Sequence, residues 1–162
     1  MKRIIFIFLS LLPAFMYAQF IGVAGQVADS KGQFAATMSA PYKILGNDDH
    51  AFQFVLSSGM EYTTSGPKIS GLNFKPISVW MVGNNMESPI SYGLRLDGGY
   101  NFNLTHGQNG VIVTPNLYLD WSVFYVSAGY DYNISHKQSQ FYVRMGVGIT
   151  LGLLKKIGGK FR

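Results

Sequence analysis

The strictest constraint on this chain is a regular alternation of apolar with polar or small side chains, which is clearest over 141–153. Every odd position from Phe141 to Leu153 is apolar, whereas the even positions hold Tyr142, Arg144, three glycines and a threonine. Successive side chains of a strand point to opposite faces, so this segment predicts a strand with one wholly apolar face. The same period of two predicts eight strands in all, at 20–28, 33–43, 52–62, 72–81, 90–102, 111–121, 124–133 and 141–153.

Short connections join the predicted strands, which favours hairpins throughout. At Ser122–Val123 a two-residue turn would pair Trp121 with Phe124 and keep both apolar patterns in register. Within 72–81 the apolar residues change parity at Pro76, which predicts a β-bulge because proline cannot donate to a strand ladder. An even number of hairpin-linked strands without a helical segment predicts an all-β fold, an eight-stranded antiparallel up-and-down barrel.

The first eighteen residues have the pattern of a secretory signal peptide. Met1–Arg3 is basic, 4–15 is almost entirely apolar, and the small residue Ala18 precedes the expected cut at Gln19. A helix of twelve residues spans about 18 Å, less than the roughly 30 Å hydrocarbon core, which favours cleavage over the alternative of an uncleaved anchor. We therefore expect a signal peptide at 1–18, a barrel at 19–154 and a basic C-terminal tail at 155–162.

Composition narrows the possible functions. Charged residues make up only 13% of the chain, against roughly 25% in ordinary soluble domains, and 48% of the residues are apolar, which excludes a disordered chain. The absence of cysteine excludes a disulfide scaffold, a thiol nucleophile, a cysteine-based zinc site and a cysteine-anchored lipoprotein. The net charge of +5 comes from the two ends, since 19–154 carries 7 basic and 8 acidic residues. Without a basic face, we expect no nucleic-acid partner.

The content of the two strand faces predicts which face is inside. The polar faces hold many glycines, serines and threonines with few charges, whereas the apolar faces carry aromatic residues near the strand ends. Small residues with balanced charges suit the crowded lumen of an eight-stranded barrel. Aromatic residues at both strand ends are typical of the interfacial girdles of a transmembrane barrel. We therefore expect a transmembrane barrel with its apolar faces on lipid and its ionised groups paired inside.

Three groups of residues follow from this assignment. The expected polar network of the lumen contains Glu61, Arg95, Asp97, Asp120, Asp131 and Arg144. Lys43 is expected to face the same lumen, and Lys75 is a further candidate. The expected lipid-facing residues are Val126, Val143, Val147 and Leu151. The expected aromatic girdle contains Trp121, Phe124, Tyr132 and Phe141.

Over 19–154 the pattern resembles the small eight-stranded outer-membrane barrels, similar to OmpX and the transmembrane domain of OmpA. The Ala18–Gln19 junction also resembles signal peptides of Bacteroidota. The resemblance implies a multi-pass position in the outer membrane of a Gram-negative cell, insertion by the barrel-assembly machinery, and both termini in the periplasm. Those barrels usually end on an aromatic residue, whereas here the last predicted strand finishes near Leu153 and Phe161 is penultimate.

Candidate chemistry is sparse. Some small outer-membrane barrels modify lipid A with a histidine, a serine and an acid at the membrane rim. His136 and Ser139 share a predicted connection, but no acidic residue stands beside them. His50 follows Asp48 and Asp49, and three adjacent side chains cannot converge on one metal ion. We expect no catalytic residue, no metal and no cofactor.

The sequence therefore predicts a non-enzymatic, porin-like integral protein of the outer membrane, either structural or a small subunit of a larger assembly. Its expected partners are membrane lipid, the barrel-assembly machinery during insertion, and a protein in the same membrane. Two alternatives remain open. One is an enzyme that modifies lipid A, and the other is a secreted, soluble lipocalin-like barrel that binds a ligand inside.

Overall fold

The structure is a computed structural model that describes residues 20–45, 52–66, 68–83, 90–104 and 108–149. The predicted signal peptide, the basic tail and Leu151 lie outside these residues. The strands are β1 (Phe20–Ala28), β2 (Lys31–Leu45), β3 (Phe52–Thr63), β4 (Gly71–Gly83), β5 (Ile90–Phe102), β6 (Gly110–Trp121), β7 (Phe124–Asn133) and β8 (Gln138–Ile149).

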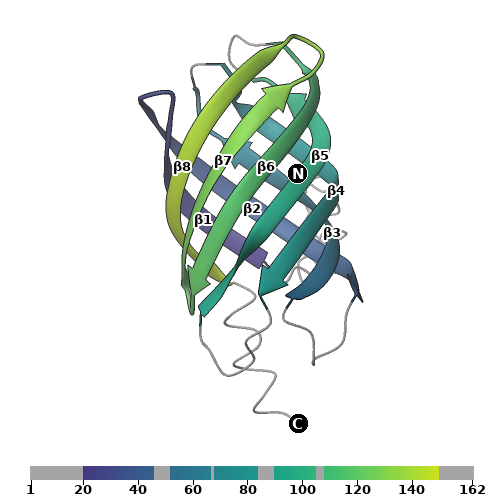
Figure 1. The fold of residues 1–162 in the computed structure, drawn as a ribbon. Coiled ribbons are helices and arrows are strands. Elements are labelled where there is room, and N and C mark those ends of the chain that lie inside the picture. Colours follow the sequence, from purple (N-terminus) through teal and green to yellow (C-terminus); the bar gives the residue numbers. More distant parts are fainter. Residues whose placement is uncertain (1–19, 46–51, 67, 84–89, 105–107, 150–162) are drawn as a thin grey trace, which may run out of the picture.

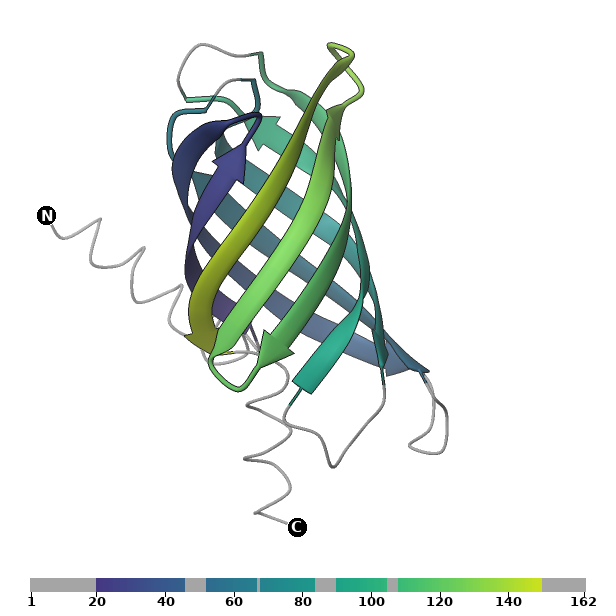
Figure 2. The same cartoon turned by 60° about the vertical axis from the view of Figure 1, so that its left-hand side comes forward.

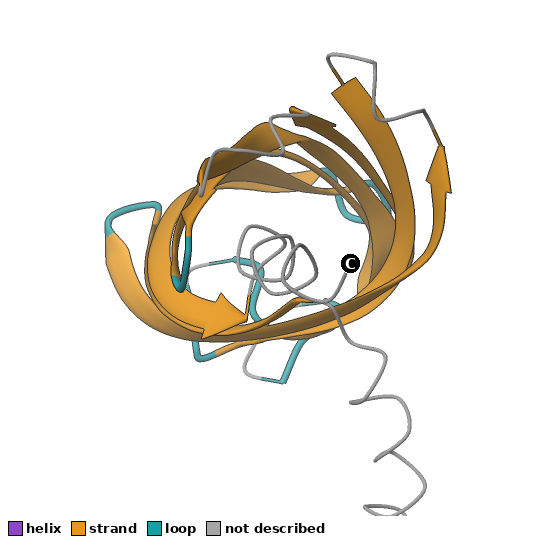
Figure 3. Ribbon diagram, turned by 90° about the horizontal axis from the view of Figure 1, so that it is seen from below, coloured by secondary structure: helices purple, strands orange, loops and turns teal. Residues whose placement is uncertain are grey.

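The strands close into one antiparallel barrel (Figure 1). Each strand pairs with the next, and β1 pairs with β8 from Ile21↔Ile149 to Ala28↔Tyr142. The view along the axis shows the closed ring of strands (Figure 3). The predicted eight-stranded up-and-down barrel is therefore confirmed. Among the described residues, no helix is long and apolar enough to cross a membrane.

The two ends of the barrel differ in the connections they carry. At the end where β1 begins and β8 finishes, which we name the near end, lies the β6–β7 turn (Figure 2). At the opposite end, the far end, lie the β1–β2 and β7–β8 turns and the longer β3–β4 and β5–β6 connections. Because the strands alternate in direction, every side chain can be assigned to a level between these ends.

Two tight turns use left-handed backbone at residues other than glycine. Asp29 and Ser30 have φ angles of 43° and 68°, and Ser122 has a φ of 59°. Turns of this hand match the twist of the strands they join. The predicted pairing of Trp121 with Phe124 across the β6–β7 turn is confirmed.

Two β-bulges change which of the following residues face the lumen and which face outward. The predicted bulge at Pro76 is confirmed, since the β4–β5 register shifts between Phe74 and Ile77. A second bulge, which the sequence did not predict, adds Tyr42 to β2, where Pro41 pairs with Ser57 but Lys43 with Leu56. The extra residue reverses the parity of β2 after Pro41. The prediction that Lys43 faces the lumen is therefore wrong, because Lys43 is exposed on the outer face.

The seam between β1 and β8 depends on glycine. A Cβ at Gly146 would lie 2.3 Å from the Val23 carbonyl oxygen and 2.6 Å from the Ala24 Cβ. We expect Gly146→Ala to lower the free energy of unfolding by about 1–3 kcal/mol, because the backbone of β1 must move. Gly25→Ala is the matched control, since a Cβ there meets nothing within 4 Å. Equal urea midpoints for the two variants would contradict this prediction.

Candidate functional site

The side chains that point toward the barrel axis are mostly polar or charged. The structure places all six residues of the predicted polar network inside, and adds Lys75, which is 2% exposed. Apart from Arg95, whose side chain is 9% exposed, the predicted residues are at most 4% exposed. Buried charges are tolerated only when they are paired and hydrogen-bonded, so their partners decide what this lumen can do.

Arg144 joins three strands across the lumen. Its guanidinium donates to both carboxylate oxygens of Glu61, at 2.8 Å each, and to the side-chain oxygen of Gln26 at 2.9 Å from Nε. Gln26 donates in turn to Gln33 at 2.8 Å, and the Tyr142 ring lies 4.8 Å from the guanidinium carbon. The bidentate geometry holds β8 against β3 on the other side of the lumen, independently of the strand ladder.

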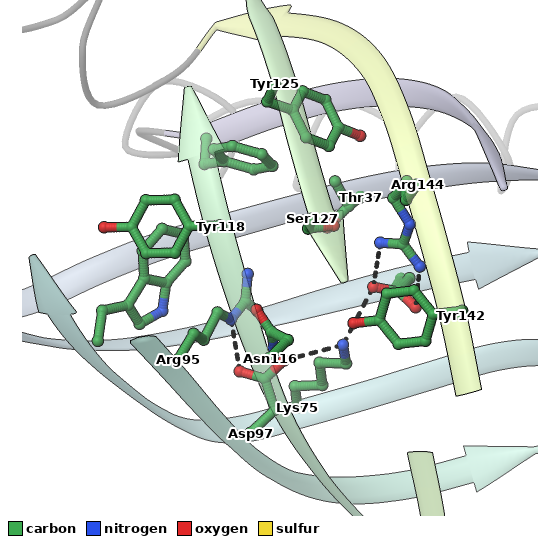
Figure 4. A pocket seen from close by; sticks show the side chains of 13 residues that line it. Thr37, Lys75, Arg95, Asp97, Asn116, Tyr118, Tyr125, Ser127, Tyr142 and Arg144 are labelled. Atoms are coloured by element: carbon green, nitrogen blue, oxygen red, sulfur yellow. Dashed lines mark hydrogen bonds and ion pairs between the residues drawn. The ribbon is translucent and has the colours of Figure 1, made fainter. Parts of the chain in front are cut away.

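Lys75 extends this network to the opposite wall (Figure 4). Its ammonium group lies 3.0 Å from Glu61 Oε2 and 3.0 Å from Asp97 Oδ2. Asp97 also accepts from Arg95 Nε at 2.5 Å and from the Ser78 hydroxyl. A continuous chain of ion pairs and hydrogen bonds therefore links β1, β2, β3, β4, β5 and β8.

Asp131 lies apart from this chain. Its carboxylate accepts from the Thr114 hydroxyl at 2.6 Å, and no described cation lies within ion-pair distance. Toward the far end the lumen is lined by amides, with Asn101 donating to Asn73 at 2.6 Å. The structure thus brings Glu61, Arg95, Asp97 and Arg144 into one network through Lys75, but not Asp131.

An aromatic layer fills the lumen at the near end. Phe20 packs edge-on against Trp80 and Tyr125, with ring centroids 5.9 and 5.2 Å apart, and Trp80 packs against Tyr118 at 5.3 Å. The Arg95 guanidinium carbon lies 4.3 Å from the Trp80 ring centre, which joins the aromatic layer to the charged network. The remaining cavity between them has a volume of about 30 Å³, which leaves room for a few water molecules at most.

The β3–β4 connection closes the far end. Ile69 is 2% exposed, and its backbone exchanges two hydrogen bonds with the Gln140 side chain, at 3.2 and 3.1 Å. Lys68 anchors the connection through an ion pair with Asp29 at 2.9 Å and a bond to the Ser139 carbonyl at 3.1 Å. With the aromatic layer at one end and Ile69 at the other, the described lumen is a packed interior.

The Lys68 ammonium group holds the pKa of Asp29 below its usual value of 3.8, mainly by its hydrogen bond to that carboxylate. A depressed carboxyl pKa stabilises the fold above the unfolded pKa, and this stabilisation is lost as the pH falls below about 4. We expect Asp29→Asn to cost less than about 1 kcal/mol at pH 7, because the pair is solvent-exposed. Urea unfolding should show the difference from wild type vanishing near pH 2. A difference that persists unchanged there would contradict the assignment.

The outer wall is apolar. Val143 and Val147 are each 45% exposed, and Val126, also predicted to face lipid, is half-buried on the same face. In the described strands, all charged side chains are buried or nearly buried in the lumen except those of Lys31 and Lys43, which are exposed near the two ends of β2. The wall between the two ends therefore presents no ionised group.

Aromatic side chains form two belts around this wall. Four strands each carry an outward aromatic pair spaced eight residues apart, namely Phe34 and Tyr42, Phe54 and Tyr62, Tyr92 and Tyr100, and Phe124 and Tyr132. The predicted girdle residues Trp121 and Phe141 are 59% and 53% exposed, at the near and far ends. Eight residues span about 26 Å along a strand, or about 20 Å along the axis at the usual tilt of such barrels.

The one described histidine, His136, lies in the β7–β8 turn at the far end. His136 Nε2 lies 2.9 Å from the Asn109 carbonyl, which ties the β7–β8 turn to the β5–β6 connection. Ser139 contributes its backbone carbonyl to Lys68. His50 and His106 lie outside the described residues. Within the described ranges, no three histidine, aspartate or glutamate side chains are placed to hold a metal ion.

Sequence reasoning missed several lumen residues. Gln26 could have been found, since it shares the inward parity of Ala24 and Ala28 in β1. Lys75 was named only as a further candidate for the lumen; it precedes the Pro76 bulge, so its parity depended on where the bulge began. Ile69 carried no signal, because strand periodicity does not extend into a connection.

No protein-family model, curated protein or solved structure matches this chain.

Proposed function

We propose that this protein is an integral β-barrel of the outer membrane, without enzymatic activity, that acts as a structural element or as a small subunit of a larger assembly. The observation that carries the proposal is the inside-out distribution of side chains. Arg144 is 4% exposed while its neighbours Val143 and Met145 are 45% and 68% exposed. A barrel that worked in water would expose the charged face and bury the apolar one.

The two aromatic belts support the same proposal. Transmembrane barrels carry an apolar band about 25 Å tall between two aromatic girdles, and the belts here are about 20 Å apart along the axis. Closure also matters, because a bilayer offers no water to an unpaired strand edge. The pairing of β1 with β8 leaves no such edge.

The packed lumen favours a structural or subunit role. Ligand pockets usually have volumes of about 300–1,000 Å³, whereas the cavity between the charged network and the aromatic layer measures about 30 Å³. A lipocalin-like role would need an interior that could take up a ligand. With the lumen filled and the described far-end turns short, the outer wall offers the largest area for contact with a partner.

The test begins with the membrane. We expect the mature protein to sediment with the outer membrane, to need detergent for extraction, and to migrate differently on a gel before and after boiling. Purification from native membranes should then recover a stoichiometric protein partner if the protein is a subunit. Lipid A mass should be the same with and without the protein. A protein that stays folded and soluble without detergent would contradict the proposal.

A further inference from the structure

The far end carries a one-sided group of three lysines, Lys31, Lys68 and Lys137, which we name the lysine arc. Lys68 lies 2.9 Å from Asp29 and 3.1 Å from the Ser139 carbonyl. Lys31 follows Asp29 by two residues, and Lys137 precedes Ser139 by two. The three lysines therefore belong to segments that meet on one side of the rim, where the β1–β2 and β7–β8 turns lie (Figure 2).

The charge of the lysine arc is unbalanced. Asp29 is its one carboxylate among the described residues, which leaves a formal charge of +2 from three lysines. Lys31 and Lys137 are exposed, and neither forms an ion pair with a described residue. The described part of the β5–β6 connection, which contacts Lys68 through Asn103 and His136 through Asn109, has no charged residue.

Beside the lysine arc, the outer wall lacks side chains at two positions. A Cβ at Gly25 or at Gly32 would meet nothing within 4 Å. Gly25 lies between Phe34 and Met145 in the sheet, and these two side chains are 49% and 68% exposed. They form the sides of a slot with the bare backbone of Gly25 as its floor. Toward the rim, Val27 follows Gly25 on the outer face of β1 and is 56% exposed, so the slot continues only on the β2 side, where Val27 pairs with Gly32.

We propose that the lysine arc and this slot together bind a phosphorylated lipid, with the phosphate at the lysines and an acyl chain over Gly25. The positive charge of the lysines complements the negative charge of a lipid phosphate, and the slot is apolar and one side chain deep. Each lysine near an anionic surface contributes a factor of roughly five in affinity, so a net charge of +2 predicts a preference of about 30-fold over a zwitterionic lipid. The inference rests on the proposed membrane position.

Native mass spectrometry of the barrel, released from phosphatidylcholine vesicles that contain phosphatidic acid, tests this inference. We expect wild type to retain one phosphatidic acid molecule, and Lys31→Gln/Lys137→Gln to lose most of the 30-fold preference. This variant leaves the Lys68–Asp29 ion pair intact. Gly25→Leu should also weaken retention, because the new side chain fills the slot while every lysine remains.

Lys155→Gln/Lys156→Gln is the matched control, since it removes the same charge from the tail and should keep the preference. Heat-modified migration of each sample reports insertion separately. If the barrel inserts and retains both lipids equally, or if the tail variant loses the preference as well, the lipid site is wrong and the membrane position stands. If the barrel does not insert, both proposals fail.

Discussion

Arg144→Ala is expected to lower the free energy of unfolding by about 3–5 kcal/mol, the usual cost of removing one partner from a buried ion pair. The Arg144 guanidinium donates to both oxygens of Glu61, which is 3% exposed. Without Arg144, the cationic partner that Glu61 keeps among the described residues is Lys75, which also pairs with Asp97. Urea unfolding of the refolded barrel, followed by tryptophan fluorescence, measures this loss.

A double variant separates the pair from the rest of the lumen. Arg144→Ala/Glu61→Gln also removes the carboxylate that has lost one of its two cationic partners, so it should recover part of the stability lost in Arg144→Ala. The difference between the double variant and the sum of the singles gives the coupling between the two groups. If the stability changes of the two single variants simply add up in the double variant, the two side chains do not stabilise each other.

Leu96→Lys is expected to destabilise the barrel in lipid by about 2–4 kcal/mol, the cost of a lysine at the bilayer midplane. Leu96 is 51% exposed on the outer wall of β5, four residues from Tyr92 in one belt and four from Tyr100 in the other. It is therefore the outward residue of β5 farthest from both interfaces. Unfolding of the barrel in phosphatidylcholine vesicles gives the free energy for this variant and for wild type.

Leu104→Lys is the matched control. Leu104 is 67% exposed, and it lies eight residues beyond Leu96, outside the far belt. The same substitution should cost about 0–1 kcal/mol there, because charge is tolerated near the interface. Equal costs at the two positions would mean that the wall does not cross a hydrocarbon layer.

Strand periodicity was sufficient to predict the architecture. The alternation along β5 and β7 predicted both strands with the bounds that the structure has, 90–102 and 124–133. It succeeded because a sheet with one apolar face fixes the facing of every residue once the register is known. Proline also signalled the bulge in β4 correctly, since it cannot donate to the ladder.

The remaining features depend on contacts across the barrel. The bulge at Tyr42 adds one residue to β2 without a sequence signal, so the facing of Lys43 was predicted wrongly. Arg144 on β8 contacts Glu61 on β3 across the lumen, and the two residues are 83 positions apart in sequence. Alternation placed both side chains on the inner face, but it gives neither their levels along the axis nor their partners. The closure of the far end by Ile69 is a tertiary contact of the same kind.

The most direct test of the membrane account is the environment of the outward residues in β8. The chain has no cysteine, so single cysteines at the odd positions from Phe141 to Ile149 can carry a spin label with no native thiol to remove. In vesicles, these labels should be accessible to oxygen, which concentrates in lipid. Access of the odd positions to a water-soluble nickel chelate would contradict the account.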